Sequence, residues 1–455
     1  MQNTARQLLS RPTYLIPHTS YLIIFLLFFA SQMSAQQELG LHFMPHVWQS
    51  NSTNPAFVQD NKLTIGLPGI YSSIAFDGPT YNQIVAKQDG KTVVDIDKLI
   101  GHLDAENTIR NELGIPSLSL SFKLKNLHLT IGHAVKYNAF LNYPKTLPQV
   151  VWQGNAQFIG QTVELGNEVE LAGYHELMAG AAYEMGPVTL GANVKFLSGI
   201  AGAATDKDHH AARLYTDPDV YQITLNGDYI LHSANTIDYQ EFEDVNVDFD
   251  YAKLTAQKFF SKNNGMDFDL GLRAELGKLD LAASVLDLGK ITWDDNVTNY
   301  EATQTYQYDG LDFSGALTGD SVSFGDALDT LKAIFKVEET NGSYTTTLTR
   351  KIYLSARYKL NEKWAVSGLF FNENYRDEPF SSVAVGINFS PIKQLNAGLS
   401  YAFKQPDSYD NLGLNLTLKL GPVQVFGVTD NLFSLINPSD AHSFSARAGA
   451  SVSIK

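Results

Sequence analysis

The sequence predicts an all-β fold, a transmembrane antiparallel β-barrel of about 14 strands with short helices in its loops. Three observations lead to this fold class. Apolar and polar residues alternate within many segments, the connections between these segments are short and long in turn, and the composition includes 26 Phe and 22 Tyr. Residues 117–124 are typical, because serine or lysine at positions 119, 121 and 123 alternates with Leu118, Leu120, Phe122 and Leu124. Successive side chains of a strand point to opposite faces, so we expect this apolar face to meet lipid and the polar face to line a lumen.

Twelve of the expected strands come as six pairs, each joined by a short turn of two to five residues. The pairs are 117–124 with 127–137, 175–184 with 188–197, 266–276 with 279–286, 351–360 with 364–371, 382–389 with 395–404, and 411–420 with 423–429. Segments 63–76 and 443–454 add a first and a last strand, which places both ends of the barrel domain on the side of the short turns, as an even-numbered barrel requires. Pro68 and Gly69 interrupt the first strand, so we expect a bend there.

Between these pairs lie long connections, above all residues 138–173, 198–265 and 289–349. Short turns on one rim and long loops on the other are typical of outer-membrane barrels and not of soluble sandwiches. Residues 96–114 and 325–336 have apolar residues at helical spacing. We expect both segments to be helices that cover the barrel rim, with partner docking or gating as the alternative.

The first 35 residues are typical of a secretory signal peptide. Arg6 and Arg11 precede the apolar run Tyr21–Ala30, which is followed by the sequence SQMSA. This run is shorter than the roughly 20 apolar residues that a membrane-spanning helix needs. We therefore expect a signal peptide at 1–35, a periplasmic or lumen segment at 36–61 and a barrel at 62–455. The expected location is the cell outer membrane, whose lipid would be the first partner.

Composition excludes several classes of function. The formal net charge of −15 argues against nucleic acid as a partner, because phosphate binding needs positive charge. The absence of cysteine excludes disulfides, thiolate metal sites and a lipidated amino-terminal cysteine. The excess of acidic residues is explained by solvated loops.

Two segments resemble metal sites. Residues 244–250, DVNVDFD, begin like a calcium loop but lack the required glycine at Phe249 and the required acid at Thr255, so an exposed strand is the better interpretation. Residues 205–210, TDKDHH, bring Asp206, Asp208, His209 and His210 together in sequence. Adjacent histidines on a flexible segment seldom converge on one ion, and we expect a solvated loop.

Signals of catalysis are absent from the sequence. No Gly-x-Ser-x-Gly motif marks a nucleophilic serine, and no phosphate-cradling or dinucleotide-binding glycine motif is present, so we expect no enzyme activity and no cofactor. His133 and His175 fall within expected strands, where we interpret them as hydrogen-bonded residues of the lumen or of an interface.

Several stretches together resemble a known family. They are NSTNPAF with Asn54, Pro55 and Ala56, LTIGLPGIYSSIAF, VVWQGNAQFIGQTVEL, DFDLGLRAEL with LAASVLDLGKITW, KIYLSARYKL, and a last segment with Asp430, Asn431 and Leu432. In their order and spacing the chain resembles the uncharacterised outer-membrane barrels of Bacteroidota of the FadL/PorV type. The ending, with Gly449, Val452 and Ile454, is similar to the assembly signal of such barrels but lacks the usual terminal aromatic residue.

The resemblance implies a limited set of functions. Members of the family include transporters of hydrophobic molecules and accessory barrels of the type IX secretion system, so the first expectation is passage or binding of small molecules, hydrophobic ones among them. The alternative is a non-conducting scaffold that docks protein partners such as secretion-system components or cargo. A third possibility is a soluble exported β-protein. We expect a structural or lumen role for Asn54, Pro55, Ala56, Asp430 and Asn431. An apolar open lumen would favour transport, and a plugged lumen with ordered loops would favour docking.

Overall fold

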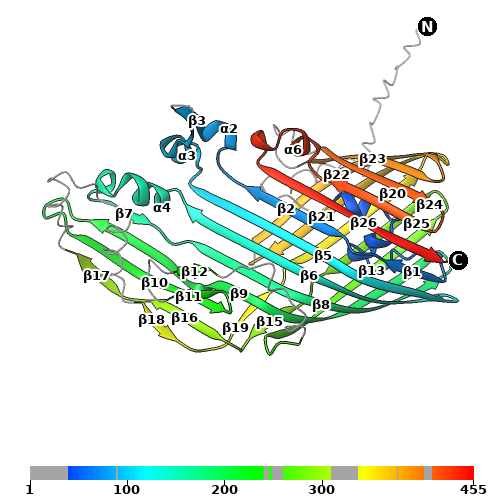
Figure 1. The fold of residues 1–455 in the computed structure, drawn as a ribbon, viewed down its shortest axis with the longest axis horizontal. Coiled ribbons are helices and arrows are strands. Elements are labelled where there is room, and N and C mark those ends of the chain that lie inside the picture. Colours follow the sequence, from blue (N-terminus) through cyan, green and yellow to red (C-terminus); the bar gives the residue numbers. More distant parts are fainter. Residues whose placement is uncertain are drawn as a thin grey trace, which may run out of the picture.

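The structure is a computed structural model that describes residues 39–88, 91–239, 245–247, 260–308, 337–376, 378–403 and 412–454. Its main element is a closed antiparallel barrel of 14 wall strands (Figure 1). β1 and β2 together count as the first wall strand. The wall consists, in order, of β1 (Leu63–Gly66) with β2 (Ile70–Phe76), β5 (Glu106–Leu124), β6 (Leu127–Pro144), β8 (Glu168–Met185), β9 (Val188–Thr216), β13 (Asn264–Leu276), β14 (Leu279–Leu286), β20 (Arg350–Lys359), β21 (Trp364–Tyr375), β22 (Glu378–Ile392), β23 (Leu395–Phe403), β24 (Leu412–Leu420), β25 (Val423–Thr429) and β26 (Ser443–Ile454).

The barrel closes where its last strand meets its first. β26 pairs with both β1 and β2, with Leu63 opposite Ile454 and Ile70 opposite Ala448. The other wall strands each pair with their neighbours along the chain, so the predicted fold class and its 14 strands are confirmed. At the interruption between β1 and β2, the Gly69 N–H donates to the carbonyl of Pro116 on β5 (3.0 Å). The wall therefore bends at the predicted position and stays paired.

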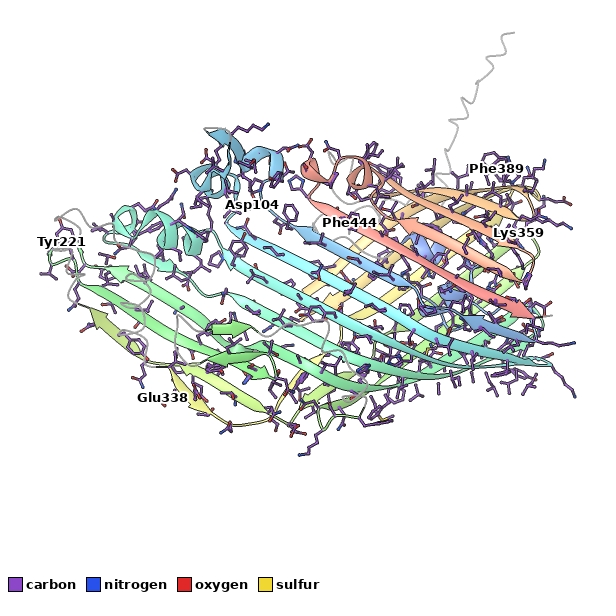
Figure 2. The ribbon with its side chains drawn as sticks, viewed as in Figure 1. Asp104, Tyr221, Glu338, Lys359, Phe389 and Phe444 are labelled. Atoms are coloured by element: carbon purple, nitrogen blue, oxygen red, sulfur yellow. The ribbon has the colours of Figure 1, made fainter. Side chains whose placement is uncertain are left out.

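Tight turns join the wall strands at one end of the barrel, which we call the short-turn end. Residues with positive φ make several of them: Lys125 at 58°, Gly186 at 63°, Gly277 at 66° and Gly421 at 61°. Two-residue hairpin turns need this left-handed backbone, which glycine adopts without steric cost. Figure 2 shows Lys359 at the short-turn end and Tyr221 at the opposite, long-loop end.

The two faces of the wall have opposite chemistry. On β13, Asp267 and Asp269 are buried inside the barrel, whereas Met266, Phe268 and Leu270 are exposed on its outer surface. On β5, Leu118, Phe122 and Leu124 are likewise exposed, and Ser121 is buried on the inner side. The outward side chains thus form a continuous apolar band around the barrel. The orientation predicted from the alternation of these segments is confirmed.

One part of the wall continues far beyond the rest, which the sequence did not predict. β9 has 29 residues, and its outer half pairs with β10 (Ile223–Ala234) instead of β13. The projecting wall (Figure 1) also contains β7 (Thr162–Glu164), β15 (Lys290–Trp293), β16 (Val297–Ala302), β17 (Thr305–Tyr308), β18 (Glu338–Thr340) and β19 (Tyr344–Thr347). Large parts of the expected connections 138–173, 198–265 and 289–349 are therefore strands. The segment 205–210 lies within β9 and is not a loop.

The helix expected at 96–114 is right only in its first half. α3 spans Ile96–His102 and is capped by the Asp95 side chain, which accepts from the Lys98 N–H (3.0 Å). From Glu106 onwards the chain is β5, in which Arg110 pairs with Glu373 and Glu112 lies 4.0 Å from Lys351 inside the barrel. The helix expected at 325–336 lies outside the described residues.

The remaining elements are short. They are α2 (Tyr81–Ile84), α4 (Thr146–Pro148), α6 (Leu432–Ile436), the hairpins β3 (Val85–Gln88) with β4 (Lys91–Val94) and β11 (Ile237–Tyr239) with β12 (Val245–Val247), a π-helical turn at Gln149–Gln153, and 3-10 turns at Gly40–Phe43, Trp48–Ser52, Ala156–Phe158 and Pro438–Asp440. β12 agrees with the strand expected within 244–250, whose other residues lie outside the described part. Among the described residues, no helix is both long and apolar enough to span a membrane.

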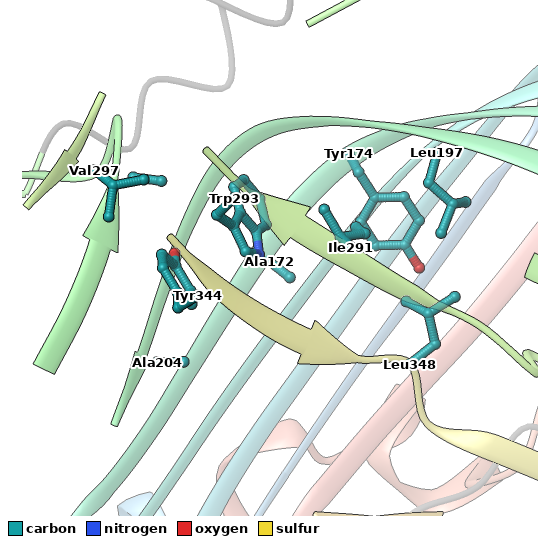
Figure 3. Close-up of a cluster of buried hydrophobic side chains, with 10 residues drawn as sticks. Ala172, Tyr174, Leu197, Ala204, Ile291, Trp293, Val297, Tyr344 and Leu348 are labelled. Atoms are coloured by element: carbon teal, nitrogen blue, oxygen red, sulfur yellow. The ribbon is translucent and has the colours of Figure 1, made fainter. Parts of the chain in front are cut away.

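A cluster of buried hydrophobic side chains, several of them aromatic, packs at the junction between the projecting wall and the barrel (Figure 3). Trp293 is fully buried there, and its indole N–H donates to Thr346 Oγ1 (2.9 Å). Its ring lies directly against two glycines of β9: a Cβ added to Gly202 would come within 2.6 Å of the indole, and one added to Gly199 within 2.7 Å. Glycine is thus required where the ring of Trp293 meets the strand.

Candidate functional site

Residues 39–57 fill the barrel at the short-turn end, and we call this segment the plug. Its apolar side chains are buried against the inner wall, among them Leu41, Phe43, Met44, Val47, Trp48 and Phe57. Wall residues complete two of the clusters: Tyr353, Leu369 and Phe371 surround Phe43, and Phe426 and Val428 lie beside Leu41 and Met44. The plug therefore has its own apolar interface inside the barrel. Residues 39–61 of the expected segment 36–61 are described.

Neutral hydrogen bonds make up most of the polar contacts between plug and wall. The Trp48 indole N–H donates to Ser119 Oγ (2.9 Å), and the Gln49 side chain donates to the carbonyl of Ala450 (2.7 Å). The hydroxyl of Ser284 donates to the carbonyl of Thr53 (2.6 Å). Such bonds satisfy buried polar groups without burying a charge.

Asn54, Pro55 and Ala56 form the tightest contact of the plug. The Asn54 side chain donates to the carbonyls of Leu272 (3.2 Å) and Ala283 (3.1 Å), while its oxygen accepts from the Ala56 N–H (2.8 Å). A Cβ on Gly191 would lie 2.4 Å from the carbonyl carbon of Pro55. The asparagine therefore anchors the plug to wall carbonyls, and glycine in the wall leaves room for the plug backbone.

Asp430 and Asn431 follow β25 and have different partners. Asp430 Oδ1 accepts from the Gly40 N–H of the plug (2.6 Å), which is a charge-assisted bond. Asn431 instead caps α6: its oxygen accepts from the Ser434 N–H (3.0 Å), and its amide donates to the carbonyl of Ser443 (2.8 Å). Four of the five predicted residues thus meet at the interface of plug and wall, and Asn431 does not.

His42 is one of two histidines of the plug whose pKa burial lowers to about 3; the other is His46, 3.2 Å from Thr417 Oγ1. The Nε2 of His42 lies 2.9 Å from Ser355 Oγ and its Nδ1 lies 3.1 Å from Thr53 Oγ1, while its ring stacks on Tyr353 at 4.8 Å. Burial lowers the pKa of His42 to about 3, because the charged imidazolium would lose its hydration there. The docked plug accordingly holds this histidine in the neutral form.

A layer of buried ion pairs crosses the lumen beyond the plug. Lys195 on β9 is its centre, with its ammonium 2.8 Å from Asp267, 2.6 Å from Asp269 and 2.9 Å from Asp287. A second pair, Lys136 with Glu176 at 2.6 Å, and Lys351, which lies 3.8 Å from Asp287, belong to the same network. We call these residues the charged layer.

The charged layer includes the one described group of acids or histidines whose ligand atoms lie close enough for a metal ion. Oxygens of Glu176, Asp267 and Asp287 lie within 4.8 Å of one another. The Lys195 ammonium, however, is already the cation for two of these carboxylates. The geometry is therefore that of an ion-pair network. In the segment 205–210, His209 pairs instead with Asp228 (2.6 Å).

Ion pairs also close the lumen towards the long-loop end. The end of β21 reaches across to β5, where Glu373 accepts from both terminal nitrogens of the Arg110 guanidinium. Arg376 donates to the carbonyl of Thr205 (2.9 Å) and lies 3.1 Å from Glu168. The Tyr375 ring packs on Phe140 with centroids 4.3 Å apart. We call this group the outer closure.

Two cavities within the described part of the chain adjoin these groups. A chamber of about 180 Å³ lies against the plug and the charged layer; its lining includes Trp48, Tyr71, Glu112, Lys136, Tyr174, Glu176, Lys195, Asp287, Lys351, Tyr353 and Arg447. A second, outer cavity of about 680 Å³ lies towards the long-loop end and includes Glu170, Asp206, His232, Tyr344 and Arg376. The chamber combines aromatic rings with charges of both signs.

The charged layer was missed by the sequence analysis. Lys195, Asp267 and Asp287 are separated by up to 92 residues and belong to β9, to β13 and to the segment that follows β14. Only the register of β9 against β13, which places Lys195 opposite Asp267, brings them together. The inward position of each charge was predictable from alternation, but the partner was not.

Comparison with known proteins gives one family match. A family model, DUF5723, described as a family of unknown function, matches residues 55–430. No curated protein matches the chain.

Solved structures are similar to the chain only at low identity. The toluene transporter TodX of Pseudomonas putida shares 10% identity with a TM-score of 0.40, covering 89% of this chain and 92% of that one. The toluene transporter TbuX of Ralstonia pickettii shares 10% with a TM-score of 0.33, covering 88% and 92%. A FadL homologue of Pseudomonas aeruginosa shares 10% with a TM-score of 0.33, covering 88% and 90%. These similarities are too weak to support an inference about the function of this chain.

Proposed function

We propose that this chain, which belongs to the DUF5723 family, is an outer-membrane barrel that takes a small amphipathic molecule into its chamber and passes it across the membrane. Hydrophobic solutes that carry a polar group fall within this class. The observation that carries the proposal is the chamber itself, an internal cavity with the plug on one side and the outer closure towards the other end.

The apolar band supports the membrane location. Exposed aliphatic side chains lie on the outer face of consecutive strands, for example Ile131 on β6, Leu270 on β13 and Leu354 on β20. Water would be a poor solvent for a continuous apolar surface of this kind, and lipid a good one. With residues 1–35 as an export signal, the short turns would face the periplasm and the projecting wall the outside.

The lining of the chamber supports an amphipathic ligand. Aromatic rings of Trp48, Tyr71 and Tyr353 offer apolar surface, and charges of both signs come from the charged layer and from Arg447. A purely apolar molecule would strip water from these charges without replacing it, which costs free energy. A molecule with an apolar body and a polar head would satisfy both parts of the lining.

Passage requires that the plug move, because its side chains fill the short-turn end of the lumen. The chain offers a direct way to hold it in place. Ser284 of the wall donates to the carbonyl of Thr53 of the plug, so these two positions are chosen for a pair of cysteines. Formation of the disulfide is verified by mass spectrometry before the assay. The native chain has no cysteine to interfere.

The experiment is entry of anilinonaphthalene sulfonate, an aromatic body with an anionic head, into albumin-filled liposomes that contain the protein. We expect the Thr53→Cys/Ser284→Cys variant to pass the dye when it is reduced. When it is oxidised, the rate of dye entry should fall at least tenfold. The two single-cysteine variants, treated with the same oxidant, are the controls. Equal entry in the oxidised and reduced states, or no entry above protein-free liposomes in any state, would contradict the proposal.

A second candidate function is a scaffold that docks protein partners, such as secretion-system components or cargo. The observation in its favour is the projecting wall, which offers a large ordered surface with exposed apolar side chains at Val151, Trp152, Val220 and Tyr221. This function needs no movement of the plug. A crosslinkable residue at position 152 that captures one defined partner in cells, together with absent dye entry, would favour the scaffold over passage.

A further inference from the structure

Three polar side chains meet on the outer face of the wall, within the apolar band. Gly132 faces the lumen, since a Cβ there would lie 3.3 Å from the side chains of Ser119 and Met178, so its neighbour His133 faces outwards. Glu176 is part of the inner charged layer, so His175 also points away from the lumen, where it is only 3% exposed, whereas Ser117 and His133 are partly exposed. Polar groups at such positions in a bilayer are costly and mark functional sites by default.

The third group, Ser117, reaches the outer face through a bulge. The register of β5 against β6 shifts between Pro116 and Leu118, so that Ser117 is an extra residue beside His133. A bulge re-aims a side chain that regular alternation would direct elsewhere. The hydroxyl of Ser117 thereby comes to lie 2.6 Å from His133 Nδ1.

The three side chains form a relay. His133 Nε2 lies 3.1 Å from His175 Nδ1, and the two rings stack with centroids 5.3 Å apart. When the Nε2–H of His133 donates to His175, the Nδ1 of His133 is left as an acceptor for the Ser117 proton. This is the arrangement of nucleophile, base and orienting group that activates a serine.

We propose that Ser117, His133 and His175 form a hydrolytic site for a carboxylic ester of a membrane lipid. Ser117 Oγ attacks the ester carbonyl carbon while His133 Nδ1 takes the hydroxyl proton. The carbon–oxygen bond to the lipid alcohol then breaks, and His133 returns its proton to the leaving oxygen. Water attacks the acyl-serine in the same way, releasing a fatty acid and restoring Ser117. His175 is a positioning residue that fixes the tautomer and orientation of His133.

The height of the site on the wall supports a lipid as substrate. Ser117 lies seven residues from Leu124, the last residue of β5 at the short-turn end. At a rise of roughly 3.3 Å per residue and a tilt of about 40°, this is roughly 18 Å into an apolar band of about 25 Å. The site thus faces the leaflet nearer the long-loop end, where lipid chains are the surrounding molecules. It does not depend on passage through the lumen.

The test uses purified protein in phosphatidylethanolamine-containing vesicles, with fatty-acid release and labelling by a fluorophosphonate as readouts. We expect the parent to release fatty acid and to gain one adduct on Ser117. Ser117→Ala should form no adduct, and its rate of fatty-acid release should be at least 1000-fold lower than that of the parent. Ser121→Ala, on the lumen side of the same strand, is the matched control and should keep both. Heat-dependent migration in gels verifies that each variant is a folded barrel.

A separate variant tests the positioning role. His175→Gln should keep the adduct on Ser117 but lower hydrolysis about tenfold and move the pH at which the rate is half-maximal, because the base has lost its orienting partner. A pH profile unchanged from the parent would remove His175 from the site. Absence of fatty-acid release by the folded parent, or full activity in Ser117→Ala, would overturn the proposal. The oxidised Thr53→Cys/Ser284→Cys barrel should hydrolyse at the parent rate, so failure of passage and failure of hydrolysis remain distinguishable.

Discussion

Acid should release the plug through two histidines, His42 and His46, because burial lowers the pKa of each to about 3. In the docked plug the His42 side chain is 3% exposed and lies between two hydroxyls, Thr53 Oγ1 and Ser355 Oγ, with the ring of Tyr353 stacked on it. None of these neighbours carries a negative charge that would stabilise an imidazolium. A released plug would return His42 to water, where the ordinary histidine pKa of about 6.5 applies.

The magnitude follows from the two pKa values of His42. Burial lowers the pKa in the docked state to about 3, so docking excludes a proton that the released state binds. The resulting stabilisation of the docked state is fully present above about pH 6.5, and is lost as the pH falls from there towards about 3. Through His42 alone, each pH unit in this window weakens docking by about 1.4 kcal/mol, which gives about 2.7 kcal/mol at pH 4.5. His46, whose pKa burial also lowers to about 3, adds to this loss.

Hydrogen exchange of residues 39–57, corrected for the pH dependence of the intrinsic rate, measures this release. Between pH 7 and pH 4.5, the protection factor of the parent should fall by more than roughly a hundredfold, because His42 alone accounts for about 2.7 kcal/mol and His46 adds to it. His42→Gln keeps a polar group near Ser355 and Thr53 but cannot titrate in this range, so it should lose roughly a hundredfold less protection than the parent, and His46 accounts for the loss that remains. The reasoning is refuted if both proteins lose protection equally, or if the parent loses none.

Three other substitutions test the wall and its closures, with the free energy of unfolding from vesicles as the measurement. Leu120→Arg, on the outer face of β5, should cost about 2–4 kcal/mol, whereas Asn138→Arg, which faces the chamber, should cost clearly less; equal costs would argue against lipid on the outer face. Arg110→Met should cost about 3–5 kcal/mol, because it leaves Glu373, whose side chain is 1% exposed, as an unpaired buried charge, and the double variant Arg110→Met/Glu373→Leu should recover most of this loss. A double variant as unstable as the single one would mean that packing dominates. Gly202→Val should cost about 1–3 kcal/mol and alter Trp293 fluorescence, since its Cβ would fall 2.6 Å from the indole, while Gly368→Val, where a Cβ meets nothing within 4 Å, should leave that fluorescence unchanged.

The barrel was predictable because its main constraint is local. In each wall strand, outward and inward side chains alternate along consecutive residues. Residues with positive φ, such as Gly277 and Gly421, mark the tight turns. These features need no knowledge of partners. They gave all 14 wall strands and their orientation.

The length of the strands was not predictable. Beyond the apolar band, apolar and polar residues no longer alternate along the chain. In β5, residues 106–112 present Arg110 and Glu112 to the lumen, where Glu373 and Lys351, their partners on other strands, are distant in sequence. The apolar residues of 96–114 therefore fit a helix, and only the tertiary ion pairs decide for a strand after Glu106. The outer half of β9 was hidden for the same reason, since its polar residues 205–210 pair with β10.

The site was predicted in part. Asn54, Pro55 and Ala56 were singled out, and their contacts with wall carbonyls and with Gly191 could not be read from the sequence. The plug also follows no periodic pattern, because it is held by individual hydrogen bonds and packs as irregular turns. Ser117 was hidden by the bulge that moves it out of the alternation of β5.

The two ends of the lumen are held by different chemistry, and this sets the order in which a ligand would meet them. The outer closure is made of ion pairs, such as Arg110 with Glu373, whereas the plug is held mainly by neutral hydrogen bonds and apolar contacts. A charged head group can replace one member of an ion pair at little net cost, but it gains nothing from an indole bonded to a serine. A molecule arriving at the long-loop end therefore needs a polar head to open the outer closure and an apolar body to compete for the plug interface. An unsubstituted hydrocarbon satisfies only the second requirement, so the proposed passage selects amphipathic molecules.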